Sequence, residues 1–109
     1  MSVDKMSITI KEATTRYVNI TCKNRGTGEP FDFTGYTVQT HLRFGENQRY
    51  LNTAIVENLL SYKIPADASL GKENGIAETR IFKDGDVFEV LRIDIWVSKA
   101  DKPDLVPNE

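Results

Sequence analysis

The stretch FDFTGYTVQTHLRF, residues 31–44, joins a turn to a regular alternation of large and polar side chains. Two rows alternate from residue 36 onward: Tyr36, Val38, Leu42 and Phe44 form one, and Thr37, Gln39, His41 and Arg43 form the other. Successive side chains of a strand point to opposite faces, whereas a helix would mix the two rows. The pattern therefore predicts a half-buried strand. Gly35 suits its entry turn, where the Asp32 side chain can accept a hydrogen bond from a nearby backbone N–H.

The same two-residue period recurs in both directions along the chain. Further strands are predicted at SITIK (7–11), RYVNITCK (16–23), YLNTAIVEN (50–58), LLSYKIP (59–65), IAETRIF (76–82) and VFEVLRIDIWV (87–97). Asp84-Gly85 predicts a tight hairpin between the last two of these strands. Residues 65–75 are predicted to form a turn that includes a single turn of helix. About seven short strands without a long helix indicate an all-β, antiparallel β-sandwich or small barrel.

Length and composition indicate one ordinary globular domain. The chain has 109 residues, 39% of them hydrophobic and 28% charged, and a net charge of −2. We expect a single domain over residues 1–99 and a mobile tail or linker over residues 100–109, which contain two prolines. The charge balance argues against nucleic acid as a partner. The sequence also lacks a signal peptide and a long apolar run, which predicts synthesis in the cytoplasm and no membrane association.

The inventory of reactive side chains argues against an enzyme. His41 is the only histidine and Cys22 the only cysteine, so neither a histidine-based triad nor a thiolate metal site can be assembled. We interpret His41 as a solvated strand residue and Cys22 as a small buried apolar one. We interpret Asp84 and Asp86 as polar residues of an exposed hairpin turn and not as a catalytic carboxylate pair. We therefore predict no catalytic residues, no metal and no cofactor.

The last predicted strand offers a candidate contact surface. One row of it is apolar throughout, and the opposite row is mixed. The apolar row is Leu91, Ile93, Ile95 and Val97, and the mixed row is Val90, Arg92, Asp94 and Trp96. We predict that the mixed row faces outward and packs against a partner. The aromatic residues leave an alternative open, a sugar-stacking platform of a carbohydrate-binding module, formed by Trp96, Tyr17, Tyr50, Tyr62 and Phe88.

The order of these features resembles a known family. An ITIK strand and RYVNITCK precede PFDFTGYTV, and LSYKIPADAS, NGIAETRIFKDG and LRIDIWVSKA follow. Over residues 7–99 this order is similar to the N-terminal immunoglobulin-like domain of phage baseplate upper proteins. The turn Asp32-Phe33-Thr34-Gly35, followed by a long strand, carries the likeness together with Pro65, Gly75 and the final strand.

The resemblance implies an immunoglobulin-like sandwich with a structural role in a phage or prophage tail. It implies other tail or baseplate proteins, or further copies of the chain, as partners, and the virion as location. The family carries no catalytic motif, so the resemblance implies no active-site residue.

Overall fold

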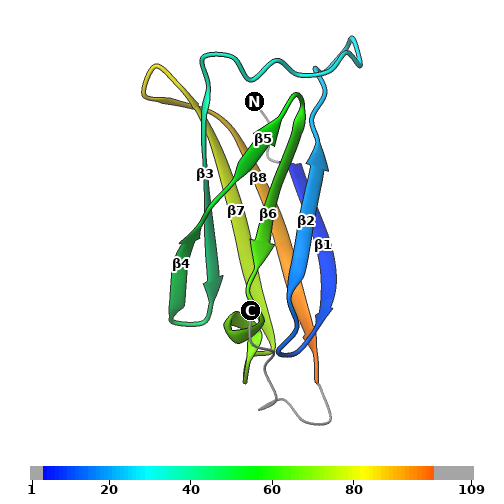
Figure 1. Cartoon of the computed structure of the whole chain (residues 1–109), viewed down its shortest axis with the longest axis vertical. Helices are drawn as coiled ribbons and strands as arrows, with labels where there is room; N and C mark the ends of the chain where they lie inside the picture. Colours follow the sequence, from blue (N-terminus) through cyan, green and yellow to red (C-terminus); the bar gives the residue numbers. More distant parts are fainter. Residues whose placement is uncertain (1–3, 100–109) are drawn as a thin grey trace.

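Eight strands and one short 3-10 helix make up the regular structure in the computed structural model, which describes residues 4–99 (Figure 1). The elements are β1 (Asp4–Lys11), β2 (Arg16–Thr21), β3 (Thr37–Phe44), β4 (Asn47–Leu51), β5 (Ala54–Val56), β6 (Leu59–Ile64), the 3-10 helix η1 (Ala66–Ser69), β7 (Asn74–Lys83) and β8 (Asp86–Ser98). The predicted tail, residues 100–109, lies outside the described residues.

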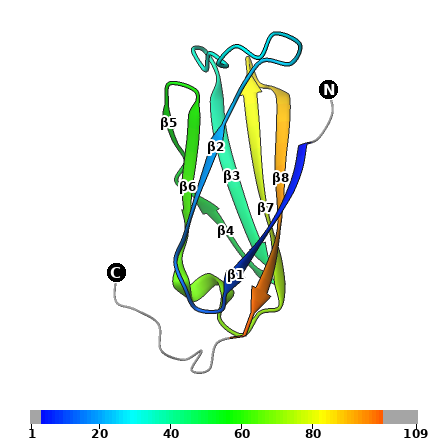
Figure 2. The same ribbon diagram turned by 90° about the vertical axis from the view of Figure 1, so that its right-hand side faces the viewer.

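The strands form two sheets that pack face to face (Figure 2). One sheet has five strands in the order β1-β8-β7-β3-β4, and the other has three in the order β2-β6-β5. The prediction of an all-β sandwich is confirmed. The prediction that the strands are all antiparallel is wrong at one place, because β1 pairs in parallel with β8. Parallel neighbours need a long connection, and here the rest of the domain supplies it.

The strand count differs from the prediction for a physical reason. The segment expected as one strand over residues 50–58 is two strands on different sheets: β4 pairs with β3, whereas β5 pairs with β6. The chain crosses between the layers at Asn52 and Thr53. The Thr53 hydroxyl lies 2.7 Å from the Thr40 hydroxyl, which ties this crossing to the five-stranded sheet.

The rows predicted for residues 36–44 are confirmed on β3. Leu42 and Phe44 are each 1% exposed, whereas Gln39 and Arg43 are exposed. The core between the layers also contains Leu60, Tyr62, Ile64, Ala77, Ile81, Ile93 and Ile95. Burying these apolar side chains removes water-accessible surface and stabilises the sandwich.

Thr40 is a polar residue on the otherwise apolar inward row of β3. Its side chain is fully buried, and its hydroxyl lies 2.9 Å from that of Thr79 on β7. Buried hydroxyls are tolerated when they are hydrogen-bonded to one another. The inward row of β3 can therefore hold a threonine without breaking the layer.

The predicted turns have the expected local chemistry. Asp84 and Gly85 both have positive φ, 53° and 84°, and join Lys83 to its partner Asp86. The backbone N–H of Thr34 donates to Asp32 Oδ1 at 2.9 Å, and this bond lowers the pKa of the Asp32 carboxyl below its usual value.

The end of the sandwich near η1 is closed by two buried polar contacts. The Gly71 N–H donates to Glu12 Oε2 at 2.6 Å, and the Ala13 N–H donates to Ser69 Oγ at 2.9 Å. Glu12 and Ser69 are 3% and 0% exposed. The first bond satisfies an oxygen of the buried Glu12 carboxylate, and the second satisfies the backbone N–H of the buried Ala13.

Candidate contact surface on the five-stranded sheet

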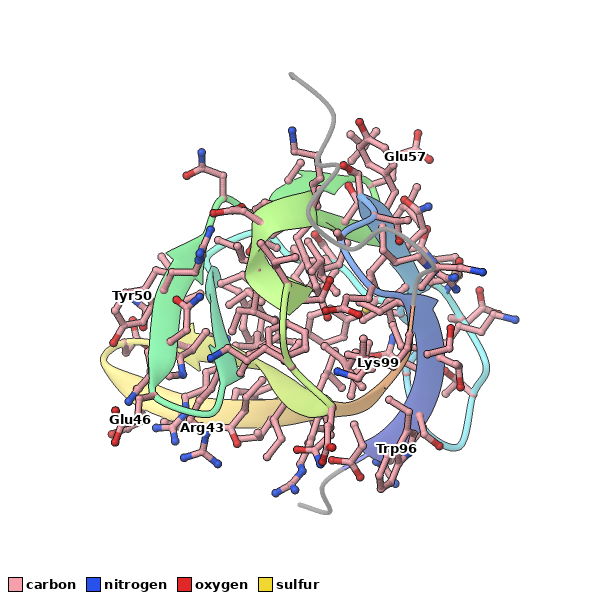
Figure 3. The ribbon with its side chains drawn as sticks, turned by 90° about the horizontal axis from the view of Figure 1, so that it is seen from below. Arg43, Glu46, Tyr50, Glu57, Trp96 and Lys99 are labelled. Atoms are coloured by element: carbon pink, nitrogen blue, oxygen red, sulfur yellow. The ribbon has the colours of Figure 1, made fainter. Side chains whose placement is uncertain are left out.

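The mixed row of the last strand lies on the outward face of the five-stranded sheet. Ile93 and Ile95 of β8 are 1% exposed and point into the core, so the alternate residues point away from it. Trp96 is 56% exposed, and the other three side chains of the row are half-buried. Figure 3 shows Trp96 and Arg43 pointing away from the three-stranded sheet on the same side of the molecule.

Strand register places further side chains beside this row. On β7, Arg80, Glu78, Ile76 and Asn74 pair with Val90, Arg92, Asp94 and Trp96 in that order. On β3, Gln39, His41 and Arg43 pair with Arg80, Glu78 and Ile76. We call these side chains, together with Tyr50 of β4, the outer face. The polar row of β3 was visible in the sequence, but its position beside β7, and one strand away from β8, depends on a strand order that no local pattern encodes.

Two ion pairs fix the centre of the outer face. Arg92 Nε donates to Asp94 Oδ1 at 3.0 Å, and Arg80 Nη2 lies 2.9 Å from Glu78 Oε1. Each pair joins residues two apart on one strand, and Glu78 and Arg92 are cross-strand partners. The side chains are 29–52% exposed, so the pairs contribute little to stability. Their effect is to hold the charged groups in defined positions.

Arg43 differs from the other arginines of the outer face. Among residues 4–99 its guanidinium has no hydrogen bond or ion pair, while Arg80 and Arg92 each have a carboxylate partner. Three arginines therefore face two carboxylates on this surface. The outer face carries an uncompensated positive charge in a chain whose net charge is −2.

A small hollow of about 130 Å³ lies at the centre of the outer face. It is lined by His41, Arg43, Ile76, Glu78 and Arg92. His41 is half-buried, and its ring lies 5.1 Å from the ring of Tyr50, so it is less solvated than the sequence suggested. The lining of the hollow is mostly polar: it has two arginines, one histidine and one carboxylate, and Ile76 is its one apolar residue.

The five aromatic residues considered for a sugar platform do not meet. Tyr62 is 4% exposed in the core, and Tyr17 lies on β2 of the other sheet. Phe88 packs against Phe31 and Tyr36, with ring centroids 5.8 and 5.1 Å away. These positions rule out a platform made from all five rings.

Trp96 and Tyr50 do share the outer face, but they lie on β8 and β4, with β7 and β3 between them. Three strand spacings amount to about 14 Å, and the two residues are also offset along the strands. One sugar ring therefore cannot stack on both.

A larger hollow of about 860 Å³ lies between the layers, outside the outer face. Its apolar lining includes Met6 of β1, Ile20 of β2, Phe31 and Leu91. Cys22 also lines it and is half-buried, which corrects the expectation of a buried cysteine. The residue packs against the core on one side and borders the hollow on the other.

Residues 4–99 contain no group of three or more His, Cys, Asp or Glu side chains arranged to hold a metal ion. Within the same range, no helix has the length and apolar character needed to cross a bilayer.

Comparisons with known proteins identify the fold. No protein-family model matches the chain, and no curated protein matches it. Among solved structures, the chain is similar to the M1 domain from titin, with a TM-score of 0.51 and 10% identity. The match covers 88% of this chain and 90% of the titin domain. At this identity the likeness shows the fold alone: the protein is an immunoglobulin-like β-sandwich.

Proposed function

We propose that this domain works by contact rather than by catalysis, and that its outer face is the surface that a protein partner covers. The observation that carries the proposal is an exposed tryptophan beside ordered arginine–carboxylate pairs on one sheet face. Trp, Tyr and Arg are enriched where protein interfaces gain most of their binding energy. The predicted contact row of Val90, Arg92, Asp94 and Trp96 forms one side of this surface.

The finer assignment is a structural domain of a phage or prophage tail baseplate, located in the virion. It is supported by the order of sequence features over residues 7–99, which resembles the immunoglobulin-like domain of baseplate upper proteins. An immunoglobulin-like sandwich is compatible with that role. The partners would be neighbouring tail proteins or further copies of the chain.

The test is complex formation with the products of the adjacent genes, which we expect to encode tail proteins. Trp96→Ser should weaken the complex at least about tenfold, as loss of an interface hot spot does. Tyr17→Ser is the matched control, because Tyr17 is a 67% exposed aromatic residue on the other sheet. A metabolic gene neighbourhood, or equal weakening by both variants, would contradict the proposal.

A second candidate function is ligand binding, and the larger hollow favours it. A volume of about 860 Å³ lies within the range of ligand pockets, and its lining is mostly apolar. Cys22 lines the hollow and is the only thiol, so protection of Cys22 from a thiol reagent would report occupancy. A carbohydrate on the outer face would instead quench the fluorescence of Trp96, the only tryptophan. Absence of both effects across a broad ligand panel would remove this candidate.

A further inference from the structure

The small hollow of the outer face has the composition of an anion site. Arg43, Arg92 and His41 contribute nitrogen groups from two strands, and Glu78 contributes the only carboxylate of the lining. Glu78 is already paired with Arg80 at 2.9 Å. The hollow therefore presents more positive than negative charge to a ligand.

The arginines differ in what they have available. Arg92 uses Nε to bond Asp94 at 3.0 Å, which fixes its side chain along β8. Arg43 is exposed and has no bonding partner among residues 4–99, so its planar fork of donors is free. A guanidinium fork matches the two oxygens of a carboxylate and binds them bidentately.

The volume of the hollow and the residues that line it indicate which kind of anion it would bind. A volume of about 130 Å³ corresponds to roughly four waters in the liquid, which is enough for a carboxylate group with its neighbouring methylene. Ile76 lines the hollow beside the charged groups and would contact that methylene. Inorganic phosphate has no methylene to contact Ile76, and its higher charge makes it lose more hydration on binding, so a carboxylate is preferred.

We propose that this hollow is a carboxylate-binding site that receives an acidic side chain of the protein partner, with Arg43 as its principal ligand. The inference rests on the proposed contact function, because it names the chemistry of the partner on the same face. An aspartate or glutamate seated there would compensate the charge of Arg43 and would orient the partner on the sheet.

The site can be tested without the partner, because His41 is the only histidine and its imidazole NMR signals report on this hollow alone. Sodium acetate, acetamide and inorganic phosphate are titrated into the full chain at constant ionic strength and pH. Acetate should shift the His41 signals saturably, and the uncharged acetamide should not. Phosphate should bind more weakly than acetate.

Variants assign the site to Arg43. Arg43→Gln should weaken acetate binding about tenfold, in line with the loss of a charge-assisted hydrogen bond. Arg16→Gln on β2 removes the same charge from the other sheet and should leave binding unchanged. The backbone amide spectrum checks that each variant is folded.

Three results would overturn the inference: no saturable shift with acetate, an equal affinity in Arg43→Gln, or tighter binding of phosphate than of acetate. Failure of the contact function remains distinguishable. If acetate binds through Arg43 but no protein complex depends on Trp96, the carboxylate site stands and the proposed function does not.

Discussion

The buried hydroxyl of Tyr62 lowers the stability that the packing of its ring provides. The side chain is 4% exposed on the inward row of β6, and within residues 4–99 its hydroxyl makes no hydrogen bond of good geometry. Burial raises the pKa of Tyr62 to about 12, and the hydroxyl of Thr79 offsets only part of this shift. Burial of the apolar ring therefore stabilises the core, whereas burial of the hydroxyl oxygen costs free energy, above all when the hydroxyl is ionised.

Tyr62→Phe should increase the free energy of unfolding by about 1 kcal/mol at pH 7, because it removes an unsatisfied buried group. The pKa of Tyr62 rises from 10.0 to about 12 on folding, so the folded state holds the phenol proton more tightly than the unfolded state does. This tighter binding stabilises the fold fully below pH 10, and the stabilisation is lost as the pH rises toward 12. The difference between the variant and the original chain should therefore grow by about 2–3 kcal/mol over that range. Urea unfolding at pH 7, 9 and 11 measures it: the difference should be the same at pH 7 and 9 and larger by about 1–1.5 kcal/mol at pH 11, and a difference that does not change with pH would contradict this account.

At the scale of the elements, β7 is held close to β3 by the absence of a side chain. Gly75 is buried at the start of β7, and its φ is not positive, so no special backbone conformation requires glycine there. A Cβ added to it would lie 2.5 Å from Cδ1 of Phe44 and 2.7 Å from the carbonyl oxygen of Arg43. The ring of Phe44 occupies the space that a side chain at residue 75 would need.

Gly75→Ala should lower the free energy of unfolding by about 1–3 kcal/mol, the usual cost of overpacking a core. The backbone carbonyl cannot move away as the end of a flexible side chain could. Asn74→Ala is the control, since Asn74 is exposed one residue earlier and its replacement should stay within about 0.5 kcal/mol. Thermal or denaturant unfolding compares the two variants. Equal stability would mean that β3 and β7 are less closely packed at this position.

At the scale of the whole molecule, the sandwich separates the side chains that stabilise the fold from those of the proposed contact surface. The two sheets bury one face each against the other, and the opposite face of the five-stranded sheet carries the charged and aromatic side chains. Neighbouring residues of β8 therefore have different surroundings: Ile95 is 1% exposed in the core, and Trp96 is 56% exposed on the outer face. The outer face can change without loss of the fold, as surface positions generally can.

Ile95→Ala should lower the free energy of unfolding by about 2–5 kcal/mol, because it leaves a cavity between the sheets. Trp96→Ser should change it by less than about 1 kcal/mol while weakening the protein complex. Denaturant unfolding of both variants gives the comparison. A large loss of stability in Trp96→Ser would place this side chain in the fold rather than in an interface.

Much of the fold could be predicted because its signals are local. The alternation of Thr37–Phe44 and of residues 91–97 assigns each side chain to a face, and the Asp84-Gly85 pair specifies its hairpin. The split of residues 50–58 into β4 and β5 could not be predicted, because changing sheets leaves the two-residue period almost unaltered. The parallel pairing of β1 with β8 also joins segments too far apart for any local pattern to reveal.

The candidate site was predictable only in part. Periodicity placed Val90, Arg92, Asp94 and Trp96 outward on one strand. The hollow needs His41 and Arg43 of β3 and Glu78 of β7 as well, and these meet only through the register of three strands.

The sequence by itself determined which side chains face the core, where the chain turns, and that the inventory of reactive groups is thin. These properties depend on neighbours within a few residues, where the geometry of an extended backbone admits few choices. Only the tertiary structure decided which strands are neighbours. Strand order places Arg43, which has no partner within residues 4–99, near Arg92 and Glu78, which are paired with Asp94 and Arg80. Strand order follows from the packing of the whole chain, because sheets gain their stability when both inward faces are buried together.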